Sequence, residues 1–321
     1  MVLFKFLCAI ITRGLFILLS LIGVWRVTWV KKDPIYWLLT LLFLPLVVEM
    51  IITLRQRKGQ DYKWFSPPIF VFLLSIIPTI WILELNHQED KSSDPQCNKL
   101  NSWENLRRVI HLNESMVMKN ATIDYLASVN QIFNTVCSND WILALHQILL
   151  ILLILGKWLL PLGGGVTRDE LSQLLLIFVG TAADILEFTS ETLSDVKESS
   201  PQLVYIILAV WTWSMLQFPL HLAVVNSKQD EDVSPGVQEG SLLSKHSTDI
   251  WSIVEALFIQ DGPFLVVRLT VMFHFKVFHQ MLCFFAIKNF LVVILNMYRL
   301  LVIFQDFRSS RQSSGNGNPV L

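Results

Sequence analysis

Long runs of apolar residues, separated by short polar segments, follow one another along most of the chain. A helix that crosses the hydrocarbon core of a membrane needs roughly 20 mostly apolar residues. About eight segments come close to this length. They cover residues 4–24, 35–54, 65–85, 141–161, 171–188, 202–225, 250–272 and 277–304. The pattern predicts an all-α fold, namely a polytopic membrane helix bundle of about eight transmembrane helices.

Tryptophan positions support the ends of these segments, because the indole ring prefers the headgroup zone of a bilayer. Most tryptophans lie at or near an expected helix end, namely Trp25, Trp29, Trp37, Trp64, Trp81, Trp141, Trp158 and Trp251. The segments 171–188 and 250–272 are the least regular, since each carries two or more acids. An alternative is therefore that one of them is re-entrant or interfacial, which leaves six or seven crossings.

Composition agrees with a membrane protein and excludes several other classes. Of 321 residues, 53% are hydrophobic and 16% are charged, against roughly 25% charged in an ordinary soluble domain. The net charge of −1 offers no field for nucleic acid. Four cysteines are too few for a disulfide scaffold and lack zinc spacing. Membrane lipids are thus the expected partners, nucleic acid is not, and the sequence names no protein partner.

Residues 86–140 form the only long polar loop between the apolar runs. Asn113 and Asn120 each begin an N-glycosylation sequon, which indicates a lumenal or exterior location. Cys97 and Cys137 flank the same loop and are a candidate disulfide. Such a bond closes a loop of about 40 residues and stabilises it by about 3–4 kcal/mol. The sequence therefore predicts a glycosylated loop on the lumenal or extracellular side.

This loop divides the chain into four parts. Residues 1–85 hold the first three transmembrane helices and 86–140 the glycosylated loop. Five further transmembrane helices occupy 141–304, and 305–321 reads as a disordered cytosolic tail. Three crossings before the loop and five after it predict that both termini are cytosolic, in the secretory pathway or plasma membrane.

Basic residues near the helix ends bear on this orientation, because cytosolic loops carry an excess of lysine and arginine. One cluster lies on the expected inner side, namely Arg55, Arg57, Lys58 and Lys63. Another lies on the expected outer side, namely Arg26, Lys31 and Lys32. The second cluster favours the opposite orientation. The prediction of cytosolic termini follows the sequons and the first cluster instead.

Ionisable residues within the apolar segments are the candidate functional residues, because charges at bilayer depth pair with one another or line a path. They include Arg13, Glu49, Asp184, Glu187, Glu255, Asp261, Arg268, Lys288 and Arg299. At about 1.5 Å per helical residue, Glu255 and Arg299 share one depth near the inner leaflet. A second set forms a predicted cluster of three acids and two bases. Asp184, Glu187, Arg268 and Lys288 share the outer half of the membrane, with Asp261 nearer the middle.

Two interpretations of this cluster remain open. In the first, the charges tie neighbouring helices together and have no ligand. In the second, they line a polar path for an ion, a proton or lipid headgroups. Asp261-Gly262-Pro263 predicts a kink or break close to the membrane midplane, since proline removes a backbone donor. Broken helices at that depth recur at transporter binding sites but also occur as plain kinks.

Motifs for catalysis, metals and cofactors are missing from the sequence. Gly163 to Gly165 are not followed by the lysine and serine or threonine of a phosphate loop. The sequence holds no His-Glu-x-x-His, no paired Cys-x-x-Cys and no Gly-x-Ser-x-Gly elbow. We therefore expect a non-enzymatic protein without a cofactor, without a metal site and without catalytic residues.

Several long runs resemble the transmembrane protein 26 family. They are Trp25–Thr28, Lys31–Pro34, Tyr62–Pro67, Trp158–Gly165, Val179–Phe188, Trp211–Leu220, Phe258–Arg268 and Lys288–Val293. The resemblance implies a multi-pass membrane protein and no particular biochemical activity. Separately, Glu198–Leu203 is similar to an E-x-x-P-Q-L stretch in XK-related lipid scramblases, which is too short to identify a family.

The sequence leaves two expectations for the function. The first is a non-enzymatic membrane protein that acts through protein partners. The alternative is a lipid scramblase or a solute or ion conduit that uses the buried charges of the last helices.

Overall fold

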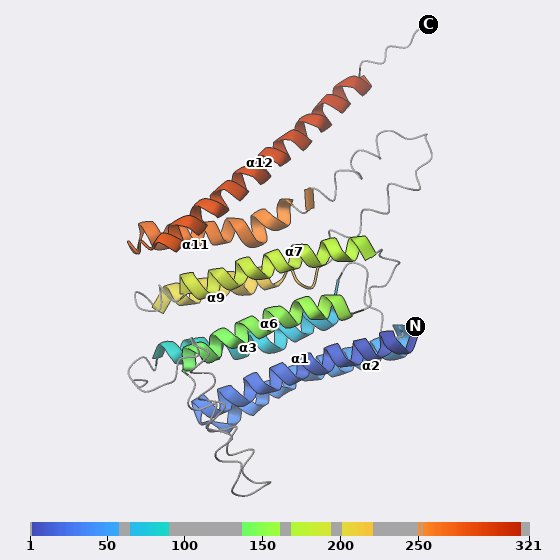
Figure 1. Ribbon diagram of the computed structural model, residues 1–321, viewed down its shortest axis with the longest axis vertical. Helices are drawn as coiled ribbons and strands as arrows, with labels where there is room; N and C mark the ends of the chain where they lie inside the picture. Colours follow the sequence, from blue (N-terminus) through green and yellow to red (C-terminus); the bar gives the residue numbers. More distant parts are fainter. Residues whose placement is uncertain are drawn as a thin grey trace, which may run out of the picture.

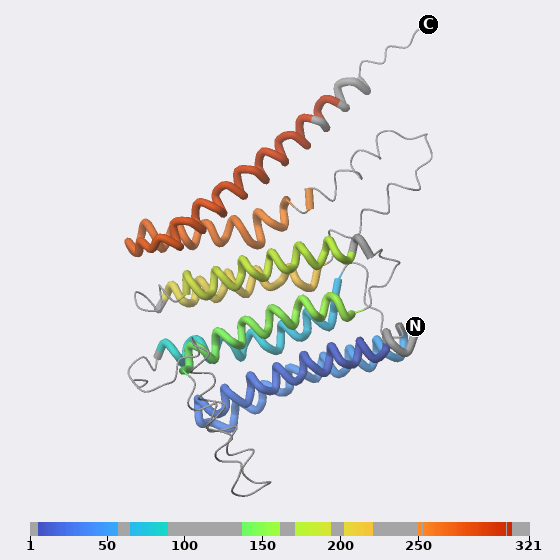
Figure 2. The backbone as a smooth tube through the Cα atoms, in the orientation of Figure 1, coloured from blue at the N-terminus to red at the C-terminus, as the bar shows by residue number. Residues whose placement is uncertain are grey.

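The computed structural model describes residues 2–57, 65–89, 137–160, 168–193, 201–220, 250–251 and 253–315 (Figure 2). This part of the chain is an all-α bundle, and its one bridge between extended residues joins Phe65 to Leu220. Seven of its helices are long and apolar enough to cross a membrane. The predicted fold class, a polytopic helix bundle, is confirmed.

The helices follow one another in the order that the apolar runs predict. The first four crossings consist of α1 (Val2–Lys31), the 3-10 helix η1 (Pro34–Phe43) with α2 (Leu44–Arg57), α3 (Pro67–Glu89) and α6 (Ser138–Leu159). The second half holds α7 (Arg168–Glu187) with the π-helix η2 (Phe188–Thr192), α9 (Pro201–Met215), the π-helix η4 (Ala256–Asp261) with α11 (Gly262–Phe273), and α12 (Gln280–Gly315).

The helices alternate in direction across the bundle (Figure 1). α1 begins at the end of the bundle where α12 finishes, whereas α3 ends and α6 begins at the opposite end. Most of the predicted long loop between α3 and α6 lies outside the described residues. The helix ends that it joins are at the opposite end of the bundle from the start of α1 and the end of α12. α12 diverges from the bundle along its second half.

The sixth crossing is shorter than the sequence predicts. The sequence predicts a helix over residues 202–225, whereas α9 ends at Met215. A turn continues to Leu220, where the backbone N–H of Ser66 donates to the carbonyl of Pro219 at 2.7 Å. The segments with several acids, α7 and α11 with their π-helices, are both long enough to cross. The short crossing is therefore α9 and not one of the two that the sequence singled out.

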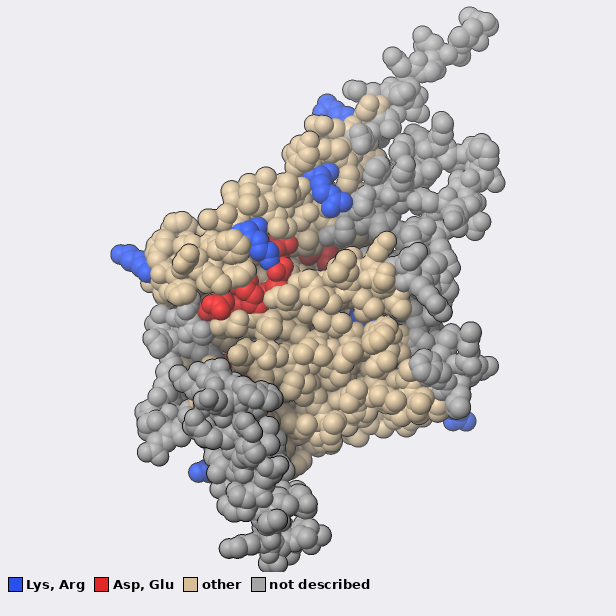
Figure 3. Space-filling model, in the orientation of Figure 1, with Lys and Arg blue, Asp and Glu red and all other residues tan. Residues whose placement is uncertain are grey.

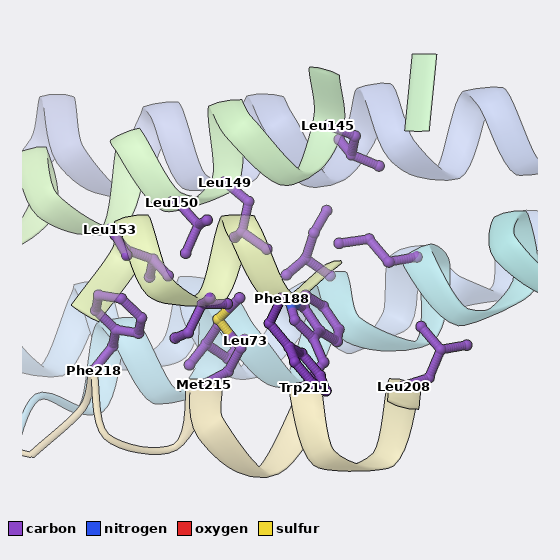
Figure 4. Packing of buried hydrophobic residues seen from close by; sticks show 14 of the residues in the cluster. Leu73, Leu145, Leu149, Leu150, Leu153, Phe188, Leu208, Trp211, Met215 and Phe218 are labelled. Atoms are coloured by element: carbon purple, nitrogen blue, oxygen red, sulfur yellow. The ribbon is translucent and has the colours of Figure 1, made fainter. Parts of the chain in front are cut away.

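One apolar core runs through the bundle and joins α1, α3, α6, α7 and α9. Figure 4 shows leucines of α6, among them Leu149 and Leu153, facing Trp211 and Met215 of α9 across this core. The α1–α6 contact is very close, because a Cβ at Gly156 would lie 2.7 Å from the ring of Phe16. Small residues allow such close helix approach in membranes.

Two π-helical segments interrupt the regular helices, namely η2 at the end of α7 and η4 before the start of α11. Proline at position 263 lacks the N–H that would continue an α-helical ladder, and its ring pushes away the carbonyl four residues earlier. The N–H of Gly262 instead reaches back to the carbonyl of Leu257. The break predicted at Asp261-Gly262-Pro263 thus takes the form of a π-helix, a feature that is frequent at functional sites.

Candidate functional site

Charged and amide side chains gather along the line where α7 faces α11 and α12. We call this set the charged seam, and it comprises Asp184, Glu187, Gln260, Asp261, Arg268, Lys288 and Asn289. In Figure 3 acidic and basic side chains meet between the part formed by α11 and α12 and the rest of the molecule. Most of the described surface around them on this face is neither acidic nor basic.

Asp184 joins α7 to both of the last two crossings. The ammonium group of Lys288 on α12 donates to its Oδ1. The side-chain amide of Gln260 in η4 donates to its Oδ2 at 3.2 Å. The sequence predicts Asp184 and Lys288 as site residues but not their pairing or the contact with Gln260. Both carboxylate oxygens of Asp184 are thus engaged.

Glu187 and Arg268 form the second pair of the seam. Nη2 of Arg268 donates to Oε2 of Glu187 at 2.5 Å, and Nη1 lies 3.3 Å from the carbonyl of Phe285. The guanidinium also lies 5.5 Å from the ring centre of Phe188 and 5.9 Å from that of Phe264. Those two rings stack on each other at 4.0 Å. The planar guanidinium suits this aromatic surrounding in a way that an ammonium would not.

Asp261 is the third acid of the seam and has no direct ionic partner. Its side chain is buried at 7% exposure and interacts electrostatically with Asp184, Lys288 and Arg268. Within the described part of the chain, no group donates a hydrogen bond to it. The seam therefore contains three acids and two bases, and both bases are paired with other carboxylates.

Three further polar atoms of the seam are buried without a hydrogen-bond partner in the described structure. They are Oε1 of Glu187, Nε of Arg268 and Nδ2 of Asn289. Asn289 follows Phe285, whose carbonyl contacts Arg268, by one helical turn and therefore shares its face of α12. Because unpaired buried polar atoms are costly, a set of one acceptor and two donors in one place calls for an explanation.

A different ion pair, Arg13 with Glu49, joins α1 to α2 and is shielded from the surroundings. We call it the closed tie. Arg13 donates from Nε and Nη2 to the two carboxylate oxygens of Glu49, both at 2.8 Å. Thr53 adds a hydrogen bond of 2.6 Å to the same carboxylate. The side chains of Arg13 and Glu49 are 0% and 12% exposed.

The seam is open by comparison. The side chains of Asp184 and Lys288 are 32% and 31% exposed, although both lie within helices that cross the membrane. Charged groups in contact with lipid tails are unfavourable unless they pair or meet polar groups. The exposed pair thus distinguishes the seam from the closed tie of Arg13 and Glu49.

Buried polar residues that the sequence did not single out lie in the middle of the bundle. Nε2 of His146 is 3.7 Å from Oε1 of Glu84, and both side chains are almost fully buried. The ammonium of Lys157, 1% exposed, donates to the carbonyl of Leu220 and lies over the ring of Phe178. Glu84 and Lys157 lie close to the ends of their apolar runs. From the sequence alone, charged residues at such positions are expected to lie at the level of the lipid headgroups and not in the bundle interior.

The remaining candidates are separate from the seam. Glu255 is half-buried and interacts electrostatically with Lys157, while Arg299 is exposed. The sequence predicts Glu255 and Arg299 at the same depth in the membrane. The described part of the structure shows no contact between them. No group of three metal-binding side chains forms within residues that the structure describes.

The predicted features of the long loop fall almost entirely outside the described residues. Asn113, Asn120 and Cys97 all lie there. Cys137 is described and is disulfide-bonded, whereas Cys8 and Cys283 carry free thiols. The pairing of Cys97 with Cys137 and the glycosylation of the two asparagines stay predictions.

Comparison with known proteins agrees with the helical architecture. No solved structure matches the chain. The model of the family described as transmembrane protein 26 matches residues 3–299. This match covers the described bundle from α1 to the middle of α12, including every residue of the charged seam. The protein, a multi-pass integral membrane protein, therefore belongs to the transmembrane protein 26 family.

Proposed function

We propose that this protein is a non-enzymatic conduit that lets phospholipid headgroups move along the charged seam. One observation carries the proposal, namely the exposure of Asp184 and Lys288 at about one third within membrane-crossing helices. A pair whose only role is to hold two helices together is sealed from lipid, as Arg13 and Glu49 are. A pair that faces lipid is placed to meet zwitterionic headgroups.

The polar groups of the seventh crossing support the same function. From Gln260 to Arg268 this crossing carries three side chains of the seam over about 12 Å, at roughly 1.5 Å per residue. This is about two fifths of a hydrocarbon core of roughly 30 Å. Gln260 and Asp261 lie at the end of the π-helix η4. Polar groups at this depth lower the cost of a charged headgroup because they replace part of its hydration.

The contacts favour binding and passage over catalysis. Asp184 is engaged by Lys288 and Gln260, and Glu187 is engaged by Arg268. The residues that define the seam include no serine, threonine or cysteine that could act as a nucleophile beside the unpaired Asp261, and the amine of Lys288 is held by Asp184. We therefore propose neither an enzymatic activity nor a cofactor.

The test is a lipid-flux assay on the purified full-length protein in liposomes. We expect wild-type protein to speed dithionite quenching of acyl-chain-labelled phospholipids in the inner leaflet. The double variant Asp184→Asn with Lys288→Gln should lower this rate at least tenfold. It removes the exposed charges while leaving neither partner as an unpaired ion, so the fold should survive.

The matched control neutralises the closed tie in the same manner. Arg13→Gln with Glu49→Gln should keep the wild-type flux, because that pair lies outside the seam. Equal flux in the seam variant and the wild type would contradict the conduit. Absence of flux in folded wild-type protein would instead favour the second candidate, a role through protein partners that cover the exposed Asp184–Lys288 pair.

The orientation of the chain is also a proposal, with both termini in the cytosol. It is supported by the shared end of α1 and α12 in the bundle (Figure 1) and by the predicted sequons between α3 and α6. We expect an N-glycosidase to reduce the apparent mass of the protein from intact cells. A protease added to those cells should leave a tag at either terminus intact. Loss of a terminal tag from sealed cells would reverse the assignment.

A further inference from the structure

The seam holds more hydrogen-bonding capacity and more negative charge than its own residues use. Asp261 is a buried acid without a direct partner, and Oε1 of Glu187 accepts no hydrogen bond. Arg268 and Asn289, 1% and 2% exposed, each present an unused donor atom. The unused acceptors thus belong to two acids, Asp261 and Glu187. The unused donors belong to the positively charged Arg268 and the neutral Asn289.

These unused groups define the chemistry of a ligand. The acceptors on Asp261 and Glu187 require a cationic group that carries N–H donors. Nε of Arg268 and Nδ2 of Asn289 require an anionic or carbonyl acceptor, and a phosphate suits a guanidinium particularly well. The ligand must therefore combine an ammonium with N–H bonds and a phosphate a short distance away.

Three common phospholipid headgroups differ in how they meet these requirements. Phosphoethanolamine has both groups and no net charge. Phosphocholine has a quaternary ammonium without N–H, so it cannot donate to Glu187 or Asp261. Phosphoserine adds a carboxylate, which is unfavourable beside three acids. The seam therefore matches phosphoethanolamine best.

We infer that the charged seam recognises the phosphoethanolamine headgroup of a membrane lipid, with its ammonium on Asp261 and Oε1 of Glu187 and its phosphate on Nε of Arg268 and Nδ2 of Asn289. This inference rests on the proposed function, because it names the headgroup that the seam carries. The proposed ligand atoms of Glu187, Arg268 and Asn289 are buried, so the headgroup enters by displacing side chains from the open side of the seam, where Asp184 and Lys288 are exposed.

The test is a methylation series of one lipid on the full-length protein in detergent. Short-chain phosphatidylethanolamine and its mono-, di- and trimethylated forms keep the phosphate and the positive charge while the N–H donors are removed one by one. Affinity is measured by titration of intrinsic tryptophan fluorescence and by the shift in melting temperature. We expect the Kd to rise with each methyl group and to be about tenfold higher for the trimethylated form, phosphatidylcholine.

Variants assign this discrimination to the seam. Asp261→Asn removes one of the two carboxylates that meet the ammonium and should narrow the difference between the four lipids, whereas Asp261→Glu should keep the full difference. Asp33→Asn is the matched control, because Asp33 is an exposed helix cap far from the seam and asparagine caps equally well. This control should retain the full tenfold difference. If Asp261→Asn fails to fold, Asn289→Leu tests the phosphate side of the site: it should lower the affinity for the whole series and keep the order of affinities, and unchanged affinity would overturn the site.

Each other outcome is decisive. Equal affinity of wild-type protein for all four lipids would overturn the headgroup inference, and flux of both lipids in liposomes would then leave the conduit standing. Graded binding without flux would keep the headgroup site and overturn the conduit. Water-soluble glycerophosphoethanolamine that binds as tightly as the lipid would overturn a membrane lipid as the source of the ligand.

Discussion

We expect the single substitution Arg13→Met to lower the free energy of unfolding by about 3–5 kcal/mol, the cost of leaving one partner of a buried ion pair uncompensated. Arg13 is fully buried and is the bidentate partner of Glu49. Its removal leaves the Glu49 carboxylate with only the hydroxyl of Thr53 as a donor from the tie. Titration with SDS of the detergent-purified protein, followed by circular dichroism, measures the change.

The double variant Arg13→Met with Glu49→Met is the control for this prediction. Replacing both partners of a buried pair by apolar residues of similar size is often neutral. We therefore expect the double variant to lose at most about 1 kcal/mol and to recover most of the stability that the single variant loses. A double variant as unstable as the single one would show that the tie acts through packing and not through charge.

A second large effect is expected from Gly262→Ala in the π-helical break. A Cβ at this position would lie 2.1 Å from the carbonyl oxygen of Leu257 and 3.3 Å from its carbon. The obstacle is backbone and cannot rotate away, so the π turn of η4 must open. We expect a loss of about 3 kcal/mol in the free energy of unfolding, together with loss of the contact between Gln260 and Asp184.

Gly180→Ala provides the comparison for this substitution. Gly180 also lies in a membrane-crossing helix, and a Cβ there would meet nothing within 4 Å. Alanine should therefore be neutral or slightly stabilising at position 180, since it is the better helix former. Equal melting temperatures for both variants would contradict the view that the π-helix depends on glycine 262.

The positions of the helices could be predicted from the sequence because each apolar run has to cover the same membrane thickness. Their ends could be predicted less well. α1 continues to Lys31 and α12 to Gly315, well past the apolar runs. Hydropathy reports burial in lipid but not the helical segments that project beyond it. The early end of α9 at Met215 has a local signal that hydropathy does not register, because Pro219 lacks the N–H that would bond to the carbonyl of Met215 and its ring clashes with that carbonyl.

The pairing of Arg13 with Glu49 shows why side-chain partners were harder to predict than helices. At α-helical rise, Arg13 lies about 27 Å from Lys31 and Glu49 only about 22 Å from Pro34. By this count the two side chains are one turn out of register. η1 rises at about 2.0 Å per residue, which moves Glu49 to about 28 Å and into register. A long 3-10 helix has no reliable signal in the sequence.

The charged seam was predictable as a group of residues but not as a set of contacts. Equal depth placed Asp184, Glu187, Arg268 and Lys288 together, and the structure brings these four into two ion pairs. Depth alone does not say which acid pairs with which base, because that depends on how each helix is rotated. Asn289 had no signal at all, since a single asparagine in an apolar helix carries no charge to mark it.

The short α9 has a consequence for the membrane around the protein. At about 1.5 Å per residue, α9 is about 22 Å long, against about 39 Å for the α1 span of 26 residues. α9 also presents Tyr205, Ile206 and Trp213 outward at half exposure. Hydrophobic mismatch makes a bilayer adapt to the element beside it. The lipid should thus be stretched beside α1 and compressed beside α9, which contacts both π-helices. A headgroup that enters the seam from this side has less hydrocarbon to cross.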